Sequence, residues 1–336
     1  MKVINRFALT TLIFLTFSNY SLTATKSSEI YVIGFGSCLT EKRDQPIWSA
    51  IKKENLNEFF FMGDNVYGDN KETGLLEDMK IAYELQKTKL PKWLEDLKVN
   101  AIWDDHDYGK NDGGSEYPLK SESQNLFLEF WKVAKDDPRW DREGIYFSEV
   151  REIFNLNVNL IGLDTRYHRS LLGQKDKPYS PIKDTSKTML GEDQWNWLID
   201  LLDQESDLNI IVSSIQVIPT GHGFEKWENF PHERAALIRL IEESEIPTII
   251  ISGDRHKAGI YKINNLIELT SSSMNKPLPN YISKIRDLIS KETDTHLVGD
   301  MYYPENYGTV TIDQKGSVLI ELKSLNGKTV NSVKLK

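Results

Sequence analysis

Cysteine is nearly absent from this 336-residue sequence, which contains only Cys38. A chain with one cysteine has no internal disulfide, so a disulfide-stabilised fold is excluded. Internal repeats, low-complexity tracts and clear inter-domain linkers are also lacking. Because α/β proteins of this length often fold as one domain, we expect a single domain over residues 25–336.

Positive charge is scarce relative to negative charge. The chain has 41 Lys and Arg residues against 50 Asp and Glu residues, which gives a formal net charge of -9. This balance argues against non-specific binding to nucleic acid, and we expect no specific nucleic-acid partner. It does not exclude a phosphate-containing substrate, because a bound metal ion can reverse the local field.

Long apolar runs are confined to the N-terminus. Lys2 and Arg6 precede an almost entirely apolar stretch, residues 7–17, and small and polar residues then lead to a cleavage point after Ala24. This pattern is typical of a signal peptide over residues 1–24, with an uncleaved anchor as the alternative. We therefore expect an exported protein, periplasmic or extracellular, without a stable membrane anchor.

The rest of the chain alternates strand-like and helix-like patterns. Apolar runs predict strands at residues 31–35, 58–62, 99–103, 144–150, 154–164, 208–217 and 248–252. Helices are predicted at residues 45–56, 73–89, 123–134, 191–202 and 232–243. Asn326-Gly327, between two apolar-rich runs at 318–322 and 329–333, predicts a β-hairpin. This order predicts an α/β fold in which two mixed β-sheets pack face to face with helices on both outer sides.

Four short polar clusters are notable because each directly follows a predicted strand. They are Gly36-Ser37-Cys38, Gly63-Asp64-Asn65-Val66-Tyr67, Asp104-Asp105-His106-Asp107 and Ser252-Gly253-Asp254-Arg255-His256. Open α/β folds build their sites at the carboxyl ends of strands, so we expect the clusters to meet. Thiolate, carboxylate, phenolate and imidazole groups together suit metal ions better than an organic cofactor.

The first two clusters also have ordinary structural interpretations. Cys38 could be a small buried hydrophobe, Asp64 could cap a turn, and Tyr67 could be a packed aromatic. The position of Cys38 in a polar loop favours a functional thiol. Asp64 follows a strand that should be buried, and Gly63 permits a sharp turn before it. The residues alone leave both interpretations open.

The cluster Asp104-Asp105-His106-Asp107 carries a more specific signal. Three carboxylates around one imidazole repel one another unless a cation compensates their charge. The alternative is a solvated loop. Beside metal-bound carboxylates, His106 would be well placed to pass a proton to a leaving group.

Two later motifs add further candidates. Asp254 and His256 alternate, so an extended backbone would present both on one side, where Asp suits a hard cation and His a borderline one. A charged strand end is the alternative. The guanidinium of Arg166 suits an anionic oxygen, and a structural ion pair with Asp164 is equally consistent with the sequence.

These clusters, in this order, resemble the alkaline phosphatase D family, a branch of the calcineurin-like metallophosphoesterases. Further shared motifs are Leu163-Asp164-Thr165-Arg166, Gln194-Trp195 and Ser214-Ile215-Gln216-Val217, and the resemblance covers about residues 31–275. It implies a double-sheet sandwich and a mixed site with iron, held partly by cysteine and tyrosine, and calcium nearby. By motif matching, the metal ligands would be Cys38, Asp64, Tyr67, Asp105, Asp254 and His256, with Asp64 bridging metals. The catalytic residues would be His106, as proton donor, and Arg166.

The leading hypothesis is therefore an exported metal-dependent alkaline phosphatase or phosphodiesterase, with residues 25–336 as a single metallophosphoesterase catalytic domain. A metal-activated hydroxide would attack the phosphorus of a phosphodiester or phosphomonoester. Iron and calcium are the expected cofactors, with other divalent cations as alternatives. Two other hypotheses remain: a secreted metal-dependent nuclease, and a non-catalytic exported module that binds cations.

Overall fold

The computed structural model describes residues 29–70, 73–174, 177–278 and 294–335. The predicted signal peptide, residues 1–24, lies outside these residues. Within them, the strands form two mixed sheets. One sheet has six strands, in the order β13 (Thr329–Leu335), β12 (Val318–Ser324), β11 (Asn306–Asp313), β1 (Ile30–Gly36), β2 (Glu58–Met62) and β3 (Lys98–Ile102). The other has seven, in the order β10 (Leu297–Tyr302), β8 (Ala258–Ile263), β9 (Leu266–Thr270), β7 (Thr248–Ser252), β6 (Leu208–Ser213), β5 (Leu156–Gly162) and β4 (Phe147–Ile153).

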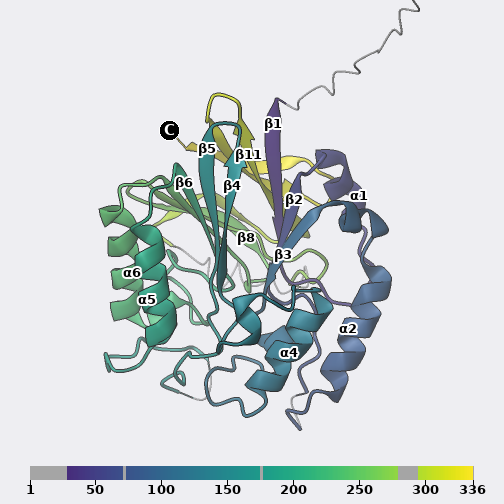
Figure 1. Cartoon of the computed structure of the whole chain (residues 1–336), viewed down its shortest axis with the longest axis vertical. Helices are drawn as coiled ribbons and strands as arrows, with labels where there is room; N and C mark the ends of the chain where they lie inside the picture. The colour runs from purple at the N-terminus through teal and green to yellow at the C-terminus, as the bar shows by residue number, and fades with distance from the viewer. Residues whose placement is uncertain (1–28, 71–72, 175–176, 279–293, 336) are drawn as a thin grey trace, which may run out of the picture.

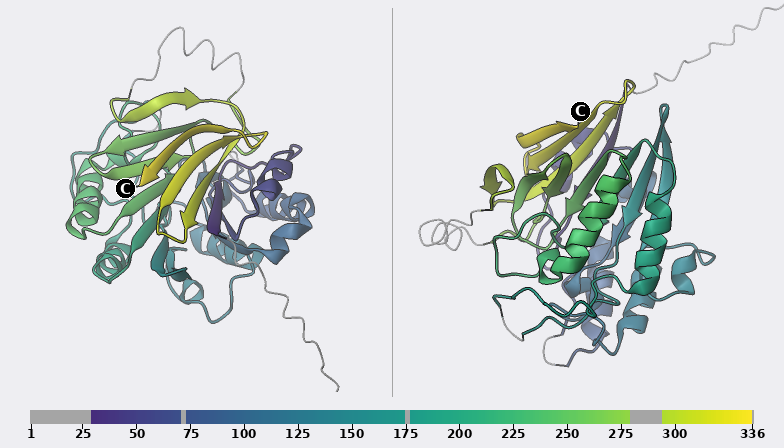
Figure 2. Two further views of the ribbon diagram at one scale, coloured as in Figure 1. Left: turned by 90° about the horizontal axis from the view of Figure 1, so that it is seen from above. Right: turned by 90° about the vertical axis from the view of Figure 1, so that its left-hand side faces the viewer.

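Helices flank the sheets on opposite sides of the molecule. The α-helices are α1 (Trp48–Ile51), α2 (Glu77–Lys89), α3 (Asp105–Tyr108), α4 (Lys120–Phe130), α5 (Glu192–Leu202) and α6 (Pro231–Glu243). Short 3-10 segments are η1 (Lys52–Glu54), η2 (Lys92–Asp96), η3 (Pro138–Trp140) and η4 (Trp227–Asn229). Figure 1 shows α1 and α2 on one flank and α5 and α6 on the other, and Figure 2 shows α5 and α6 lying over the strands of the seven-stranded sheet. The predicted fold class, an α/β sandwich with helices outside, is confirmed.

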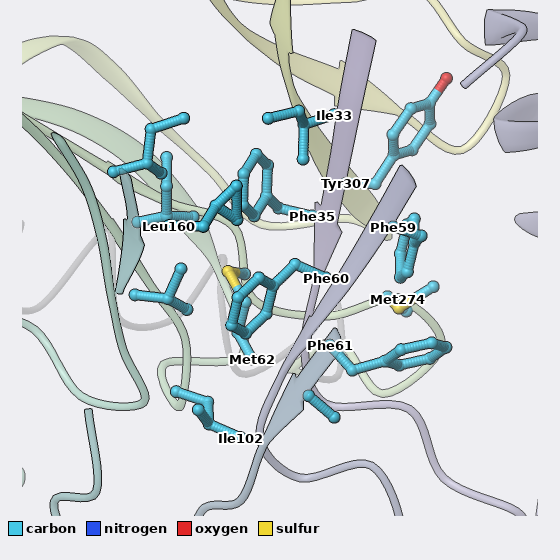
Figure 3. Packing of buried hydrophobic residues seen from close by; sticks show 14 of the residues in the cluster. Ile33, Phe35, Phe59, Phe60, Phe61, Met62, Ile102, Leu160, Met274 and Tyr307 are labelled. Carbon is cyan, nitrogen blue, oxygen red and sulfur yellow. The ribbon is translucent and has the colours of Figure 1, made fainter. Parts of the chain in front are cut away.

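Strand β2, which lies between β1 and β3, shows how the core is divided. Its apolar run has no polar face, because side chains of alternate residues are buried on both sides. Phe60 stacks on Phe147 of β4, with ring centroids 5.8 Å apart, and so faces the other sheet. Phe59 packs against Trp48 of α1 at 5.3 Å and faces the helices. Figure 3 shows Phe59 and Phe61 on one side of the strand and Phe60 on the other.

Strand direction determines where the functional loops lie. β1, β2 and β3 are parallel neighbours in one sheet, and β5, β6, β7 and β9 are parallel neighbours in the other. Parallel strands present their carboxyl ends at the same edge, which is where α/β folds place their sites. The loops after β1, β2 and β3 therefore emerge together, as the sequence predicts.

Local predictions succeeded where an apolar run was bounded by clear turn residues. The strands at 58–62 and 248–252 have the predicted bounds, and β12 and β13 form the predicted hairpin. The helix predicted at 45–56 is wrong in length, because the α-helix α1 is followed by a 3-10 turn that ends at Asn55, whose φ is 52°. The strand predicted at 208–217 ends at Ser213, since the backbone N–H groups of Val217 and Ile218 donate to the carboxylate of Glu268.

Membrane-spanning helices are absent from the part of the chain that the structure describes.

Candidate metal centre

The predicted ligands converge from both sheets. Cys38, Asp64 and the 104–107 loop follow β1, β2 and β3, and Asp254 and His256 follow β7 of the other sheet. In the described residues, ligand atoms within 4.8 Å of one another form three groups: Cys38, Asp64 and His256; Asp64, Asp105 and His106; Asp104, Asp105 and Asp254. The groups share Asp64 and Asp105, so they make one continuous cluster.

The backbone at the strand ends adopts an unusual conformation. Cys38, Asp64, Asp254 and His256 have φ values of 56°, 52°, 67° and 51°, in the left-handed region that side-chain-bearing residues rarely occupy. Such strain is concentrated at functional sites, where surrounding structure holds it in place. The prediction that 254–256 is extended is therefore wrong. Asp254 and His256 reach the cluster because each of them turns sharply after the strand.

Cys38, Asp64 and Tyr67 lie in mutual contact. The Asp64 Oδ2 atom accepts a hydrogen bond from the Tyr67 hydroxyl at 2.8 Å and lies 3.4 Å from the Cys38 Sγ atom. Burial, followed by the negative charge of Asp64, raises the pKa of Tyr67 well above its usual value. Burial also raises the pKa of the Cys38 thiol. A metal ion bound here would have to displace both protons, which makes binding stronger as pH rises.

Asp104, Asp105 and Asp107, at the start of helix α3, have separate structural roles. Asp107 accepts the backbone N–H groups of Asp64 and Asn65, each at 3.2 Å, and so fixes the loop after β2. Asp104 accepts from Arg166 Nε at 2.7 Å. Asp105 accepts the backbone N–H of Asp112 at 2.7 Å, and its other oxygen has no partner among the described residues.

His106 is held by a carboxylate that the sequence analysis did not single out. Its Nδ1 atom lies 2.5 Å from the Asp69 Oδ1 atom, so the Nε2 atom is the one left for chemistry. Burial alone would lower the pKa of His106, but the carboxylates of Asp105 and Asp64 outweigh it and raise the pKa to about 9. The imidazole is therefore protonated at neutral pH in the chain without bound cations.

His256 has the bonding pattern of a metal ligand. Its Nδ1 atom lies 2.7 Å from the backbone carbonyl oxygen of Lys276, and its backbone N–H donates to Ser272 Oγ at 2.8 Å. A ring N–H that donates to a carbonyl fixes the tautomer and leaves Nε2 as a lone-pair donor. Burial lowers the pKa of His256 to about 4, which keeps the ring neutral.

Arg166 lies behind the carboxylates and is fully buried. Its guanidinium contacts Asp104, and its Nη1 atom lies 2.6 Å from Glu225 Oε2. Asp164, the alternative partner, instead accepts the backbone N–H of Arg166 at 2.8 Å. The guanidinium therefore holds Asp104 in place, and its direct contact with a substrate oxygen stays a prediction.

The cluster fits a cation centre. Asp64 Oδ1, Asp104 Oδ2 and Asp105 Oδ1 are buried and have no hydrogen-bond partner among the described residues. Buried carboxylate oxygens without partners are costly and rare unless a cation compensates them. The thiol, phenol and imidazole at one end suit iron or a similar transition metal, whereas the carboxylates at the other end suit calcium.

Four residues that shape this centre were not predicted from the sequence. Asp69, Asp112, Glu225 and Lys276 hold His106, Asp105, Arg166 and His256 respectively. Asp69 lies in the same polar loop as Asp64 and could have been found from that position. The other three lie in segments without any recognisable motif.

A model of the PhoD-like phosphatase family matches residues 79–328. The chain belongs to this family. The resemblance to the alkaline phosphatase D family is thus confirmed, and membership supports a metal-dependent phosphoesterase. A search of curated protein sequences found no match.

Solved structures share the fold of this PhoD-like phosphatase. A structure of PhoD matches with a TM-score of 0.69 and 14% identity, over 91% of this chain and 68% of that one. A purple acid phosphatase from yellow lupin, Lupinus luteus, matches with a TM-score of 0.62 and 12% identity, over 91% of this chain and 53% of that one. GAP50, described as the anchor in the inner membrane complex of Plasmodium, matches with a TM-score of 0.61 and 16% identity, over 91% of this chain and 89% of that one. At these identities the likeness shows the fold alone.

Proposed function

We propose that this chain is an exported enzyme that hydrolyses phosphodiesters and phosphomonoesters, with iron and calcium as its cations. The observation that carries the proposal is the continuous cluster of ligand atoms, in three groups each within 4.8 Å, with an imidazole at its side. The signal-peptide pattern at residues 1–24 supports export to the periplasm or the extracellular space. Residues 25–336 would then form the single catalytic domain.

The donor atoms divide the cluster between two kinds of cation. Cys38, Tyr67 and His256 would hold iron, Asp105 and Asp254 would hold calcium, and Asp64 would be shared. When bound, the cations would supply positive charge to the phosphoryl oxygens and lower the pKa of a water molecule. The protein would supply orientation and charge balance, which dominate phosphoryl transfer.

His106 would be the general acid. Asp69 fixes its Nδ1 atom, so a proton on Nε2 would be directed toward the departing alkoxide. The surrounding carboxylates favour the protonated ring, as the raised pKa of His106 indicates. We assign Arg166 an indirect role, because its guanidinium forms an ion pair with Asp104 and so positions that carboxylate.

Turnover assays on purified protein test the proposal. We expect hydrolysis of bis(para-nitrophenyl) phosphate and para-nitrophenyl phosphate, lost after chelation and restored by iron with calcium. Metal-dependent activity on polynucleotides alone would favour a nuclease instead. Protein that binds the metals yet hydrolyses none of these substrates would be a cation-binding module, and the proposal would be wrong.

A further inference from the structure

Two loops that supply none of the predicted metal ligands meet beside the centre. The backbone N–H of Tyr179 donates to the carbonyl oxygen of Gly223 at 2.8 Å, which joins the two loops. The ammonium group of Lys177 lies 5.2 Å from the centre of the Phe224 ring. Lys177 and Tyr179 both contact the Asp112 Oδ2 atom, at 3.0 and 2.8 Å. The ammonium group of Lys177, the phenol of Tyr179 and the ring of Phe224 thus lie close together, and we call these three residues the wall.

The wall lies next to the metal centre, because its residues contact groups that are bonded to, or directly follow, predicted metal ligands. The backbone N–H of Asp112 donates to Asp105, so the residue that holds Lys177 also holds a predicted metal ligand. On the other side, the guanidinium carbon of Arg255 lies 4.4 Å from the centre of the Phe224 ring. Arg255 directly follows the predicted ligand Asp254. The wall therefore lies between two predicted metal ligands, Asp105, which follows β3 of one sheet, and Asp254, which follows β7 of the other.

The Phe224 loop is held in place by buried polar contacts. The backbone N–H of Phe224 donates to His222 Nδ1 at 3.2 Å, and the His222 Nε2 atom lies 3.0 Å from Gln216 Oε1. Burial, with positive charge nearby on Arg255, lowers the pKa of His222, so the ring is neutral and can accept at Nδ1. Lys226 Nζ donates to the carbonyl oxygen of Phe224 at 3.2 Å. The aromatic ring is thus presented by a preorganised loop.

The charges on this wall suit an anion. Two cationic side chains, Lys177 and Arg255, lie over the same ring, where the aromatic face favours positive charge. The ammonium group has three donors, and Asp112 takes one of them. The Lys177 side chain is 40% exposed, so a ligand can reach it.

We propose that Lys177, Tyr179 and Phe224 form a subsite for the second ester arm of the substrate, and that this subsite selects an arm carrying an anionic group such as a carboxylate. The inference rests on the proposed phosphodiesterase function. In this subsite, Lys177 determines which second arm is preferred and takes no part in cleavage of the phosphorus–oxygen bond. Phe224, which is partly exposed, supplies an apolar surface for the carbon chain of the arm, and the buried Tyr179 holds Asp112 through its hydroxyl group.

A matched pair of diesters tests the subsite with metal-loaded protein. Both are para-nitrophenyl phosphodiesters, one with hydroxypropanoate and one with hydroxypropanamide as the second alcohol. We expect the wild-type chain to prefer the carboxylate in kcat/KM by about tenfold, the effect of one charge-assisted contact. Lys177→Gln should remove this preference by raising KM for the carboxylate diester, and the amide diester should change less than about twofold. High salt should reduce the wild-type preference.

The control variant is Lys183→Gln, which removes an exposed positive charge from the same loop. It should leave the preference intact, and Phe224→Leu should weaken it, because it removes the ring against which the Lys177 ammonium group lies. Equal kcat/KM for the two diesters in the wild type, or an equal loss for both in Lys177→Gln, would overturn the subsite while the phosphodiesterase stands. No turnover of either diester by metal-loaded protein would overturn the phosphodiesterase and the subsite together.

Discussion

At the scale of single residues, neighbours of one chemical type do different work. Asp104, Asp105 and Asp107 lie together at the start of helix α3, yet one holds an arginine, one offers an oxygen to the cluster and one binds backbone N–H groups. The sequence predicts that carboxylates gather here, because each follows a strand. It cannot rank them, since the direction of each side chain depends on helix α3 and on residues far away in the chain. The partners of Arg166 are likewise not predictable from the sequence, because Asp104 and Glu225 are both far from it in the chain.

Asp64→Ala should abolish metal binding and activity together. Asp64 belongs to two of the three ligand groups, so its loss would disconnect the cluster. Elemental analysis and turnover of para-nitrophenyl phosphate measure the two effects on one sample. Asp136→Ala, at an exposed position, is the control and should change neither. Full metal content in Asp64→Ala would contradict its assignment as a shared ligand.

His106→Ala should keep its metal and lose rate according to the leaving group. General acids contribute about 100-fold to 10,000-fold, and mostly where the departing alkoxide is a strong base. We therefore expect a large fall in kcat for alkyl esters and a small one for para-nitrophenyl esters. Asp69→Asn should show the same pattern more weakly, because it loosens the orientation of the ring and removes one of the charges that raise the pKa of His106. Unchanged kcat on alkyl esters would exclude the acid role, and loss of metal would make His106 a ligand.

At the scale of elements, the strands were predictable and the turns that follow them were not. The runs that became β2 and β7 are apolar at their centres and buried at every residue, which is typical of strands in a parallel sheet covered on both faces. The turns that follow depend on left-handed backbone at Cys38, Asp64, Asp254 and His256. No propensity predicts that conformation for cysteine or histidine, because the folded surroundings impose it.

Gly63→Ala should damage the end of β2. Gly63 has φ +94°, and an added Cβ would lie 2.8 Å from the backbone nitrogen of Asp104. We expect a loss of about 2–4 kcal/mol in the free energy of unfolding, from the unfavourable φ and from overpacking, together with weaker metal binding. Urea denaturation and metal titration measure these effects.

Gly74→Ala separates the two causes. Gly74 also has positive φ, at +63°, but its nearest contact for an added Cβ is 3.9 Å away. It should lose only about 1 kcal/mol and bind metal normally. Equal losses in Gly63→Ala and Gly74→Ala would show that close contact with the 104–107 loop has no effect.

At the scale of the whole molecule, the centre joins the two sheets. Three of its loops come from one sheet and one from the other, so cations bound there would hold the halves together. Cation binding to the folded state alone adds about 2.7 kcal/mol when the free metal is at 100 times its dissociation constant. Chelation should therefore lower the melting temperature in calorimetry. An unchanged melting temperature on removal of a measured stoichiometric metal would contradict this linkage.

The metal-free chain should lose stability as pH rises. Burial and repulsion from Asp105 raise the pKa of Asp254 to about 6, against 3.8 in an unfolded chain. The folded state therefore holds a proton on Asp254 that the unfolded chain has lost. Its contribution to the free energy of unfolding is fully present below pH 3.8 and is lost as pH rises through 6. The free energy of unfolding should fall by at most about 1.4 kcal/mol per pH unit from this group. Urea denaturation of chelated protein should show the decline, and Asp254→Asn should flatten it; identical pH profiles would contradict the assignment.

One pairing links the two ends of the described chain. β1, which leads into Cys38, lies between β2 and β11, and its Ile30 is opposite Asp313. During synthesis from the N-terminus, one edge of β1 stays unpaired until residues 306–313 have left the ribosome. A polypeptide interrupted before Asn306 would carry an open, apolar strand edge of the kind that seeds aggregation. Completion of the six-stranded sheet therefore waits for residues 306–313.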